Sequence, residues 1–339
     1  MHKKRLLTVI SILLLSTVAI FANGEQEAGD ASDYKLVLKL SHVFSPAEQL
    51  TISMDEVAAS ILEKTNGAIE IQTFPQAQLP AYKEGVEQVV RGANFISVED
   101  PSFIGDYVAD FKALYAPMLY QSFDEYVELT QKKLVQDMMA KAEEQGIKIL
   151  ALDYIYGFRN IITDKVVKTP ADLAGVKLRT PGSKSYIDTI SAMGAIATPL
   201  PWGETLSAVQ QGVVDGLEGS EFTNLGTKVY ESRVKNVANT HHILGTCGVY
   251  ISSDVWASIP AEYQQIIQNE FTKGAKDMVS LLKSQHGGVV KELESYGVKF
   301  NDVDGAAFRE ALAPLYAEQE GMTPGIFESI FSELDSMRQ

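Results

Sequence analysis

The chain has 339 residues, which is long enough for two lobes that each bury a hydrophobic core. Its formal net charge of −15 argues against nucleic acid and anionic membrane surfaces as partners. The single cysteine, Cys247, excludes a disulfide within the chain and a metal site built from thiolates. Net charge does not exclude an anionic ligand, because one desolvated arginine outweighs a remote field that salt screens.

Residues 1–22 have the pattern of a secretory signal peptide. Basic residues precede an apolar run, and small residues follow it at the expected cleavage site. The apolar run is short for a membrane span, which leaves a retained N-terminal anchor helix as the alternative. The small, polar residues 23–33 predict a flexible leader. We therefore expect an exported protein.

The first part of the mature chain alternates strands with helices. The predicted elements are strands 34–41, 68–74 and 95–98 and helices 46–66 and 82–91. A capping box at residues 45–48 opens the first helix, with Pro46 at its first position. This order predicts an open α/β lobe with its ligand edge at His42 and Glu99.

Residues 122–162 predict a passage from this lobe to a second one. A capping box that begins at Ser122 opens one helix, which Gly146 ends. A long strand, 147–156, then leaves the first lobe, and residues 157–160 cross into the second lobe. The strand continues beyond the crossing, so this passage is one side of a hinge.

The stretch 175–220 organises the second lobe. Its predicted elements are strand 176–179, helix 186–193, strand 195–200, a helix opened by Pro201, and strand 213–218. Two such β-α units form a right-handed parallel layout, in which ligands bind at the carboxyl ends of the strands. Arg179, Trp202 and Glu218 lie at these ends.

The rest of the chain returns across the lobes and ends in helices. The predicted elements are strand 237–252, a helical region 260–296, strand 298–300 and helices 306–318 and 324–337. His241 and His242 are adjacent on a strand and point to opposite faces, so no metal site is expected there. The chain has no phosphate-binding loop, dinucleotide fingerprint or nucleophile elbow, so we expect no cofactor and no catalytic activity.

Three stretches carry a family resemblance. They read LAGVKLRTPGSKSYIDTISAMGAIATPLPWGETLSAVQQGVVDGLEGS, EKTNGAIEIQTFPQAQL and NTHHILGTCGVYIS. In their order along the chain they resemble the DctP family, the solute-binding proteins of tripartite ATP-independent periplasmic (TRAP) transporters, over nearly the whole mature chain. The resemblance implies a periplasmic location and an α/β fold of the two-lobe periplasmic-binding-protein type. Such a fold has a ligand cleft between its lobes and long segments that cross the hinge.

We expect the two lobes to share the chain between them. Lobe I takes residues 34–156, 245–284 and 315–339, and lobe II takes residues 157–244 and 285–314. The long strands then form the hinge, because they pass from one lobe to the other.

The resemblance implies ligand-binding positions for five residues. The K-L-R motif places at Arg179 the arginine that clamps a ligand carboxylate, and Arg159 occupies the position of a second arginine. Glu99 matches a position that contacts ligand hydroxyls, and Trp202 one that packs on the ligand. Glu218 matches a further family position. A guanidinium fork suits a carboxylate because it offers two parallel charge-assisted hydrogen bonds.

Structural interpretations compete with these roles. The alternatives are a surface salt bridge for Arg179, a hinge ion pair for Arg159, a helix-start carboxylate for Glu99 and a core position for Trp202. Ser41 and His42 lie at the end of the first strand, where either can donate a hydrogen bond to a ligand. A single histidine in such a place is more often structural.

Together these expectations define a receptor. It captures a small organic acid, such as a C4-dicarboxylate, a sugar acid or a branched hydroxy acid, and delivers it to integral-membrane TRAP permease subunits. It acts as a monomer, without nucleic acid, metal, cofactor or chemistry of its own. An exported ligand-sensing subunit fits the same residues and stays open. An exported α/β hydrolase is the third alternative, for which no nucleophile with a base is found.

Overall fold

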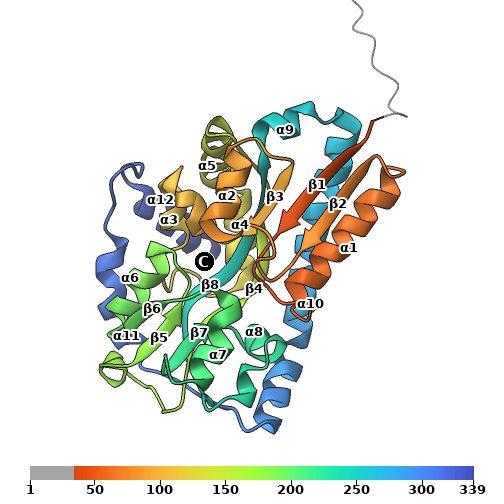
Figure 1. Cartoon of the computed structure of the whole chain (residues 1–339). Helices are drawn as coiled ribbons and strands as arrows, with labels where there is room; N and C mark the ends of the chain where they lie inside the picture. The colour runs from red at the N-terminus through yellow and green to blue at the C-terminus, as the bar shows by residue number, and fades with distance from the viewer. Residues whose placement is uncertain (1–33) are drawn as a thin grey trace, which may run out of the picture. The chain divides into compact units, whose positions relative to one another are not determined.

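The computed structural model describes residues 34–339, so the predicted signal peptide (1–22) and leader (23–33) lie outside the described residues. Within Lys35–Gln339, one mixed sheet of nine strands has the order β2-β1-β3-β8-β4-β7-β5-β6, with β9 beside β8 (Figure 1). The strands are β1 (Leu36–Ser41), β2 (Ile69–Phe74), β3 (Phe95–Glu99), β4 (Ile147–Thr163), β5 (Lys177–Thr180), β6 (Ile196–Pro199), β7 (Gly216–Gly219), β8 (Asn236–Ser252) and β9 (Lys299–Asn301).

Helices cover this sheet and build the connections between its strands. They are α1 (Gln49–Lys64), α2 (Tyr82–Val90), α3 (Asp110–Leu114), α4 (Phe123–Gln131), α5 (Lys133–Glu144), α6 (Lys184–Ala192), α7 (Thr205–Gln210), α8 (Glu221–Gly226), α9 (Ser253–Ser258), α10 (Ala261–Ser295), α11 (Gly305–Leu312) and α12 (Ile326–Met337). The alternation of strands and helices expected from the sequence is confirmed.

Two long antiparallel strands, β4 and β8, join the two sides of the sheet. Each has 17 residues, and β4 has no exposed residue. Strands covered on both faces need no polar alternation, and apolar residues form long runs in β4. β1, β2 and β3 lie on one side of the pair, and β5, β6 and β7 lie on the other (Figure 1). The predicted strand, crossing and second strand of residues 147–162 are therefore one continuous element.

The carboxyl ends of the outer strands face each other. β3 and β4 run in the same direction because both are antiparallel to β8, whereas β7 runs against β4. β3 therefore points its last residue, Glu99, toward the β7 side, and β7 points Gly219 back toward β3. β1 and β2 follow the direction of β3, and β5 and β6 follow that of β7. In open α/β sheets ligands bind at the carboxyl ends of the strands, and here both sets of carboxyl ends face the same region.

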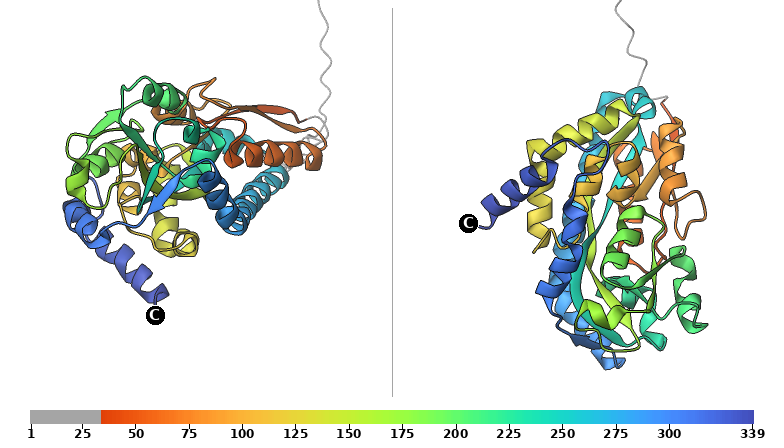
Figure 2. Two further views of the ribbon diagram at one scale, coloured as in Figure 1. Left: turned by 90° about the horizontal axis from the view of Figure 1, so that it is seen from below. Right: turned by 90° about the vertical axis from the view of Figure 1, so that its left-hand side faces the viewer.

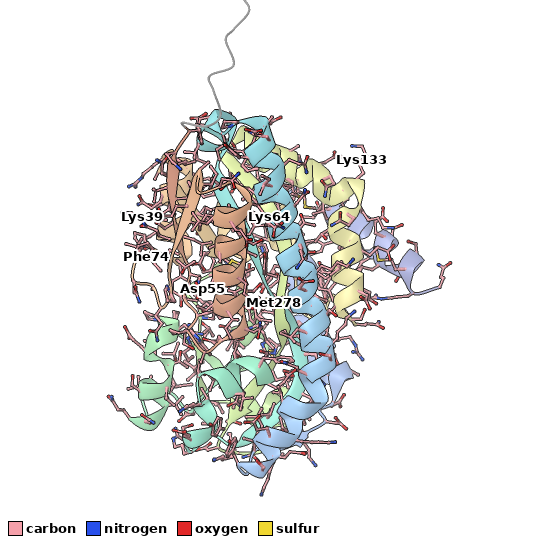
Figure 3. All side chains as sticks on the ribbon, turned by 90° about the vertical axis from the view of Figure 1, so that its right-hand side faces the viewer. Lys39, Asp55, Lys64, Phe74, Lys133 and Met278 are labelled. Atoms are coloured by element: carbon pink, nitrogen blue, oxygen red, sulfur yellow. The ribbon has the colours of Figure 1, made fainter. Side chains whose placement is uncertain are left out.

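Each side of the sheet has its own hydrophobic core. A large cluster surrounds β3 and the first half of β4 and includes side chains of α2, α4, α5 and α12. Two smaller clusters flank β5 and β7. The 35-residue helix α10 runs beside α1, where the Ser60 hydroxyl donates to Glu270 Oε2 at 2.7 Å (Figure 3). α12 packs against α3 and α4 near the C-terminus (Figure 2).

Some helices differ from the sequence-based expectation, and the helix expected at residues 306–318 ends at Leu312. α1 begins at Gln49 rather than Pro46, because only half of the predicted capping box forms. The Ser45 N–H donates to Glu48 Oε2 at 2.7 Å, but the Ser45 hydroxyl is buried without a hydrogen-bond partner. The single helix expected after Ser122 is two helices, α4 and α5, because Lys132 adopts an extended conformation between them.

Replacing Gly157 with alanine is expected to destabilise the fold by about 1–3 kcal/mol. Gly157 has φ +113° at a register shift of β4, and an added Cβ would lie 2.8 Å from the Ser220 Cβ. Urea unfolding measures the loss. Gly203→Ala is the matched control, since an added Cβ there meets no atom within 4 Å. Equal unfolding midpoints for the two variants would contradict the expectation.

Candidate functional site

A cavity lies where the two sets of strand ends face each other. Both sides of the sheet, and the long strands between them, contribute to its wall. The lining residues are Val43, Phe44, Tyr82, Glu99, Asp100, Phe103, Tyr156, Arg159, Arg179, Pro181, Tyr186, Trp202, Thr223 and Cys247.

Arg179 supplies an unpaired cation to the cavity wall. Its side chain extends from β5 and is 1% exposed. The Nε–H donates to the Leu200 carbonyl at 2.9 Å, but Nη2 is buried without a hydrogen-bond partner. Within residues 34–339, no carboxylate lies within ion-pair distance of this guanidinium. Burial lowers the pKa of Arg179, but an arginine still stays charged. The free donor can therefore receive an anion.

Arg159 is already paired inside the wall. Its Nε and Nη2 donate to the two carboxylate oxygens of Glu218, and its Nη1 donates to the Tyr156 hydroxyl at 2.8 Å. Burial alone would raise the pKa of Glu218, but the Arg159 charge and the nearby His242 ring lower it to about 2. The pair is thus ionised, and its net charge is zero. Arg159 thus forms an ion pair and also lines the cavity, while its role in ligand binding stays a prediction.

Trp202 connects the two sides of the cavity. It follows β6, and its ring centroid lies 5.0 Å from the Arg179 guanidinium carbon. Its backbone N–H donates to the Tyr82 hydroxyl at 2.8 Å, and its indole N–H donates to Glu48 Oε2 at 3.1 Å. Tyr82 and Glu48 belong to the β1–β3 side. The aromatic wall therefore also holds the two sides together.

Two adjacent carboxyl groups face the cavity from the end of β3. Glu99 Oε1 accepts the Tyr82 backbone N–H at 2.7 Å, and burial raises the pKa of Glu99 to about 8. Asp100 accepts the Tyr186 hydroxyl at 2.6 Å, and burial raises its pKa also. Glu99 is therefore mainly protonated at pH 7 and can donate a hydrogen bond. The sequence does not reveal this burial, so it could not predict the protonation of Glu99.

Ser41 and His42 end β1 but do not line the cavity. The Ser41 hydroxyl donates to the Leu79 carbonyl at 3.2 Å. Both ring nitrogens of His42 are buried without hydrogen-bond partners, and burial lowers its pKa to about 4. Their role as ligand contacts stays a prediction. The structure thus brings Arg179, Arg159, Glu99 and Trp202 together at the cavity, with Glu218 behind Arg159.

Sequence reasoning did not identify the tyrosines of the cavity. Tyr186 and Tyr115 share a hydrogen bond of 2.9 Å, and the Arg159 guanidinium carbon lies 4.9 Å from the Tyr186 ring centroid. Tyr156 ends the predicted strand directly before the crossing, and Asp100 directly follows Glu99. Proximity to a predicted strand end was the available signal for these two residues.

Two further properties concern the whole described chain. Across residues 34–339, no helix is both long enough and apolar enough to cross a membrane. The same residues contain no group of three or more histidine, cysteine or acidic side chains that could hold a metal ion.

The mixed sheet, with a cavity between the facing ends of its strands, has the fold of a two-lobe solute-binding protein. The family model for bacterial extracellular solute-binding proteins, family 7 (DctP), matches residues 40–321, so this chain belongs to that family. The resemblance noted in the sequence is confirmed, and so is the α/β, two-lobe fold class. The family consists of binding proteins of TRAP transporters and not of enzymes.

Several relatives have known ligands. A TRAP periplasmic solute-binding protein from Desulfovibrio salexigens, solved in complex with diglycerolphosphate, is 82% identical, with a TM-score of 0.89 over 90% of this chain and 98% of that one. A Fusobacterium protein with bound sn-glycerol-3-phosphate is 44% identical, with a TM-score of 0.88 over 89% and 98%. The sialic acid-binding periplasmic protein SiaP of Vibrio cholerae is 28% identical over 83% of this chain and 86% of its own.

Proposed function

We propose that this protein is the periplasmic receptor of a TRAP transporter, which captures a small organic anion and delivers it to integral-membrane permease subunits. One observation carries the proposal: the buried guanidinium of Arg179 has a free donor at the cavity and no carboxylate partner among the described residues. A buried charge without a partner is costly, so an anionic ligand is the natural partner. Export through a signal peptide at residues 1–22 and action as a monomer belong to the same proposal.

The ligand we propose is a glycerol phosphate ester. The relatives that are 82% and 44% identical hold diglycerolphosphate and sn-glycerol-3-phosphate, whereas a relative that is 28% identical holds L-galactonate. A phosphate suits the guanidinium fork as well as a carboxylate does. The protonated Glu99 and the tyrosine hydroxyls suit the glycerol hydroxyls and phosphate oxygens. The organic acid expected from the sequence stays a prediction, to be tested beside the esters.

Ligand capture would be coupled to the approach of the two lobes. Trp202 with Tyr82, Asp100 with Tyr186, and Ser102 with Ser183 (2.8 Å) form hydrogen bonds across the cavity. A ligand that bridges both sides favours the state in which these contacts exist. The proposed lobe boundaries place the hinge in β4 and β8, near residues 157 and 245.

A thermal unfolding series tests the ligand class. We expect diglycerol phosphate and sn-glycerol 3-phosphate to raise the melting temperature most, ahead of L-galactonate, succinate and inorganic phosphate. A ligand at 1,000 times its Kd stabilises the folded state by about 4 kcal/mol. A larger shift with a carboxylate would instead support an organic acid as the ligand. No shift with any compound would contradict the proposal. Recovery of unchanged ligand after long incubation separates this receptor from a hydrolase, and uptake by the permease separates it from a sensor.

Binding of diglycerol phosphate is expected to weaken above pH 8. Burial raises the pKa of Glu99 to about 8, and a bound anion opposes its ionisation. Kd should rise by about tenfold between pH 7 and pH 9. Glu99→Gln cannot ionise and should show no such rise. Titration calorimetry measures both proteins, and identical pH profiles would contradict the assignment to Glu99.

The pH dependence of unfolding also reports the ionisation of Glu99, in this case without a ligand. The folded-state pKa of Glu99 is above its ordinary value of 4.5, so its contribution to stability is fully present below pH 4.5 and is lost as the pH rises through about 8.

A further inference from the structure

We propose that Glu218 sets the charge of the ligand: by neutralising Arg159 inside the wall, it leaves Arg179 as the single uncompensated cation and so selects an anion with one negative charge. The inference rests on the proposed function, because it concerns which member of the ligand class the same cavity prefers. For glycerol phosphate esters, it favours a phosphodiester over the dianion of a phosphomonoester.

The charge count begins with the basic groups of the cavity. Arg159 and Arg179 are the two lining residues with basic side chains. Glu218 is 0% exposed and takes two of the Arg159 donors, one on each carboxylate oxygen, so this pair contributes no net charge. Of the other three N–H donors of Arg159, one on Nη2 reaches the Glu218 backbone carbonyl at 3.2 Å and one on Nη1 reaches the Tyr156 hydroxyl at 2.8 Å. Arg179 has no carboxylate partner among the described residues, so its charge is not compensated.

The other titratable groups add no positive charge near pH 7. His242 lies 3.6 Å from Glu218 Oε2, and burial lowers its pKa below the ordinary value of 6.5. The carboxyl groups of Glu48, Glu99 and Asp100 are buried around the cavity, and burial raises the pKa of each. The tyrosines Tyr82, Tyr115, Tyr156 and Tyr186 and the thiol of Cys247 also have pKa values raised by burial. Ionisation of any of these groups would only add negative charge.

The consequence follows from the cost of an uncompensated charge away from water. A phosphodiester anion beside Arg179 forms a neutral set. A phosphomonoester dianion leaves one negative charge without a partner away from water. The second pKa of a phosphomonoester is about 6, so this ligand changes from monoanion to dianion between pH 5 and pH 8, whereas a diester does not change.

The test compares sn-glycerol 3-phosphate with its methyl diester, which has nearly the same shape and one charge at every pH. Calorimetry on the wild-type protein gives both Kd values from pH 5 to pH 8. If only monoanions bind well, the ratio of the monoester Kd to the diester Kd rises by about 100-fold over this range. The diester corrects for titration of the protein. A ratio that stays constant or falls overturns the inference. If neither ligand binds at any pH, the result contradicts the proposed function itself.

Variants then assign the effect to one carboxylate. Glu218→Gln leaves Arg159 charged without compensation, so the rise of the ratio with pH should become much smaller. Glu221→Gln is the matched control, because Glu221 is also buried but pairs with His286 at 3.1 Å. The control should keep the full rise. A ratio in Glu218→Gln that rises as steeply as in the wild type would remove Glu218 from this role. If Glu218→Gln does not fold, the wild-type ratio still decides whether the cavity is limited to one charge.

Discussion

Replacing Arg179 with alanine is expected to weaken the binding of diglycerol phosphate by about two to four orders of magnitude. Removal of one partner from a desolvated, hydrogen-bonded charge pair costs about 2–5 kcal/mol, and about 1.4 kcal/mol corresponds to a tenfold change in Kd. Arg179 is 1% exposed and covered by Trp202, so water cannot replace the lost interaction at little cost. Titration calorimetry with purified protein measures the change in Kd directly.

Three further arginine variants separate charge, shape and folding. Arg179→Lys keeps the charge but cannot form two parallel hydrogen bonds, so its Kd should lie between those of the wild type and the alanine variant. Arg179→Met should leave the unliganded protein at least as stable as the wild type, because it removes a buried cation without an ion-pair partner. Arg233→Ala is the control for a general charge effect, since Arg233 is 38% exposed and pairs with Asp164. An unchanged Kd in Arg179→Ala would place Arg179 outside the binding site.

Replacing Glu218 with glutamine is expected to lower the free energy of unfolding by about 3–5 kcal/mol, which is the usual cost of removing one partner from a buried ion pair. The reason is that Arg159, which is 5% exposed, would keep its charge without a counter-charge. Globular proteins have about 5–15 kcal/mol of stability, so this loss would be a large fraction of the total. Urea unfolding measures the loss.

A double variant distinguishes an unpaired charge from lost packing. Arg159→Met combined with Glu218→Leu should recover much of the loss, because apolar residues of similar size often replace a buried pair without penalty. Asp137→Ala, which removes an exposed pair with Lys133, should cost at most about 1 kcal/mol. A double variant as unstable as Glu218→Gln would contradict the electrostatic explanation.

The same pair predicts a loss of stability in acid. The pKa of Glu218 is lowered to about 2 in the folded protein, from an ordinary value of 4.5. Its contribution is therefore fully present above pH 4.5 and is lost as the pH falls toward 2. Glu218→Gln should lack this part of the acid dependence.

The fold was largely predictable because its signals are local. Alternation of apolar residues, glycines after helices and the three family stretches act over a few residues at a time, and they placed β1 to β3 and β5 to β7 close to their observed bounds. The break at Lys132 and the late start of α1 were missed, because each depends on backbone geometry that residue type does not dictate.

By itself, the sequence determined the α/β class, the family and the residues at the facing strand ends, because these depend on periodicity and on motifs that are continuous along the chain. Only the tertiary structure decided which of these residues are paired, which are unpaired and which are protonated. It paired Arg159 with Glu218 across 59 positions and left Arg179 unpaired. It also buried Glu99 deeply enough to keep it protonated. Charge compensation and desolvation depend on distances between remote segments, and the order of residues along the chain does not contain those distances.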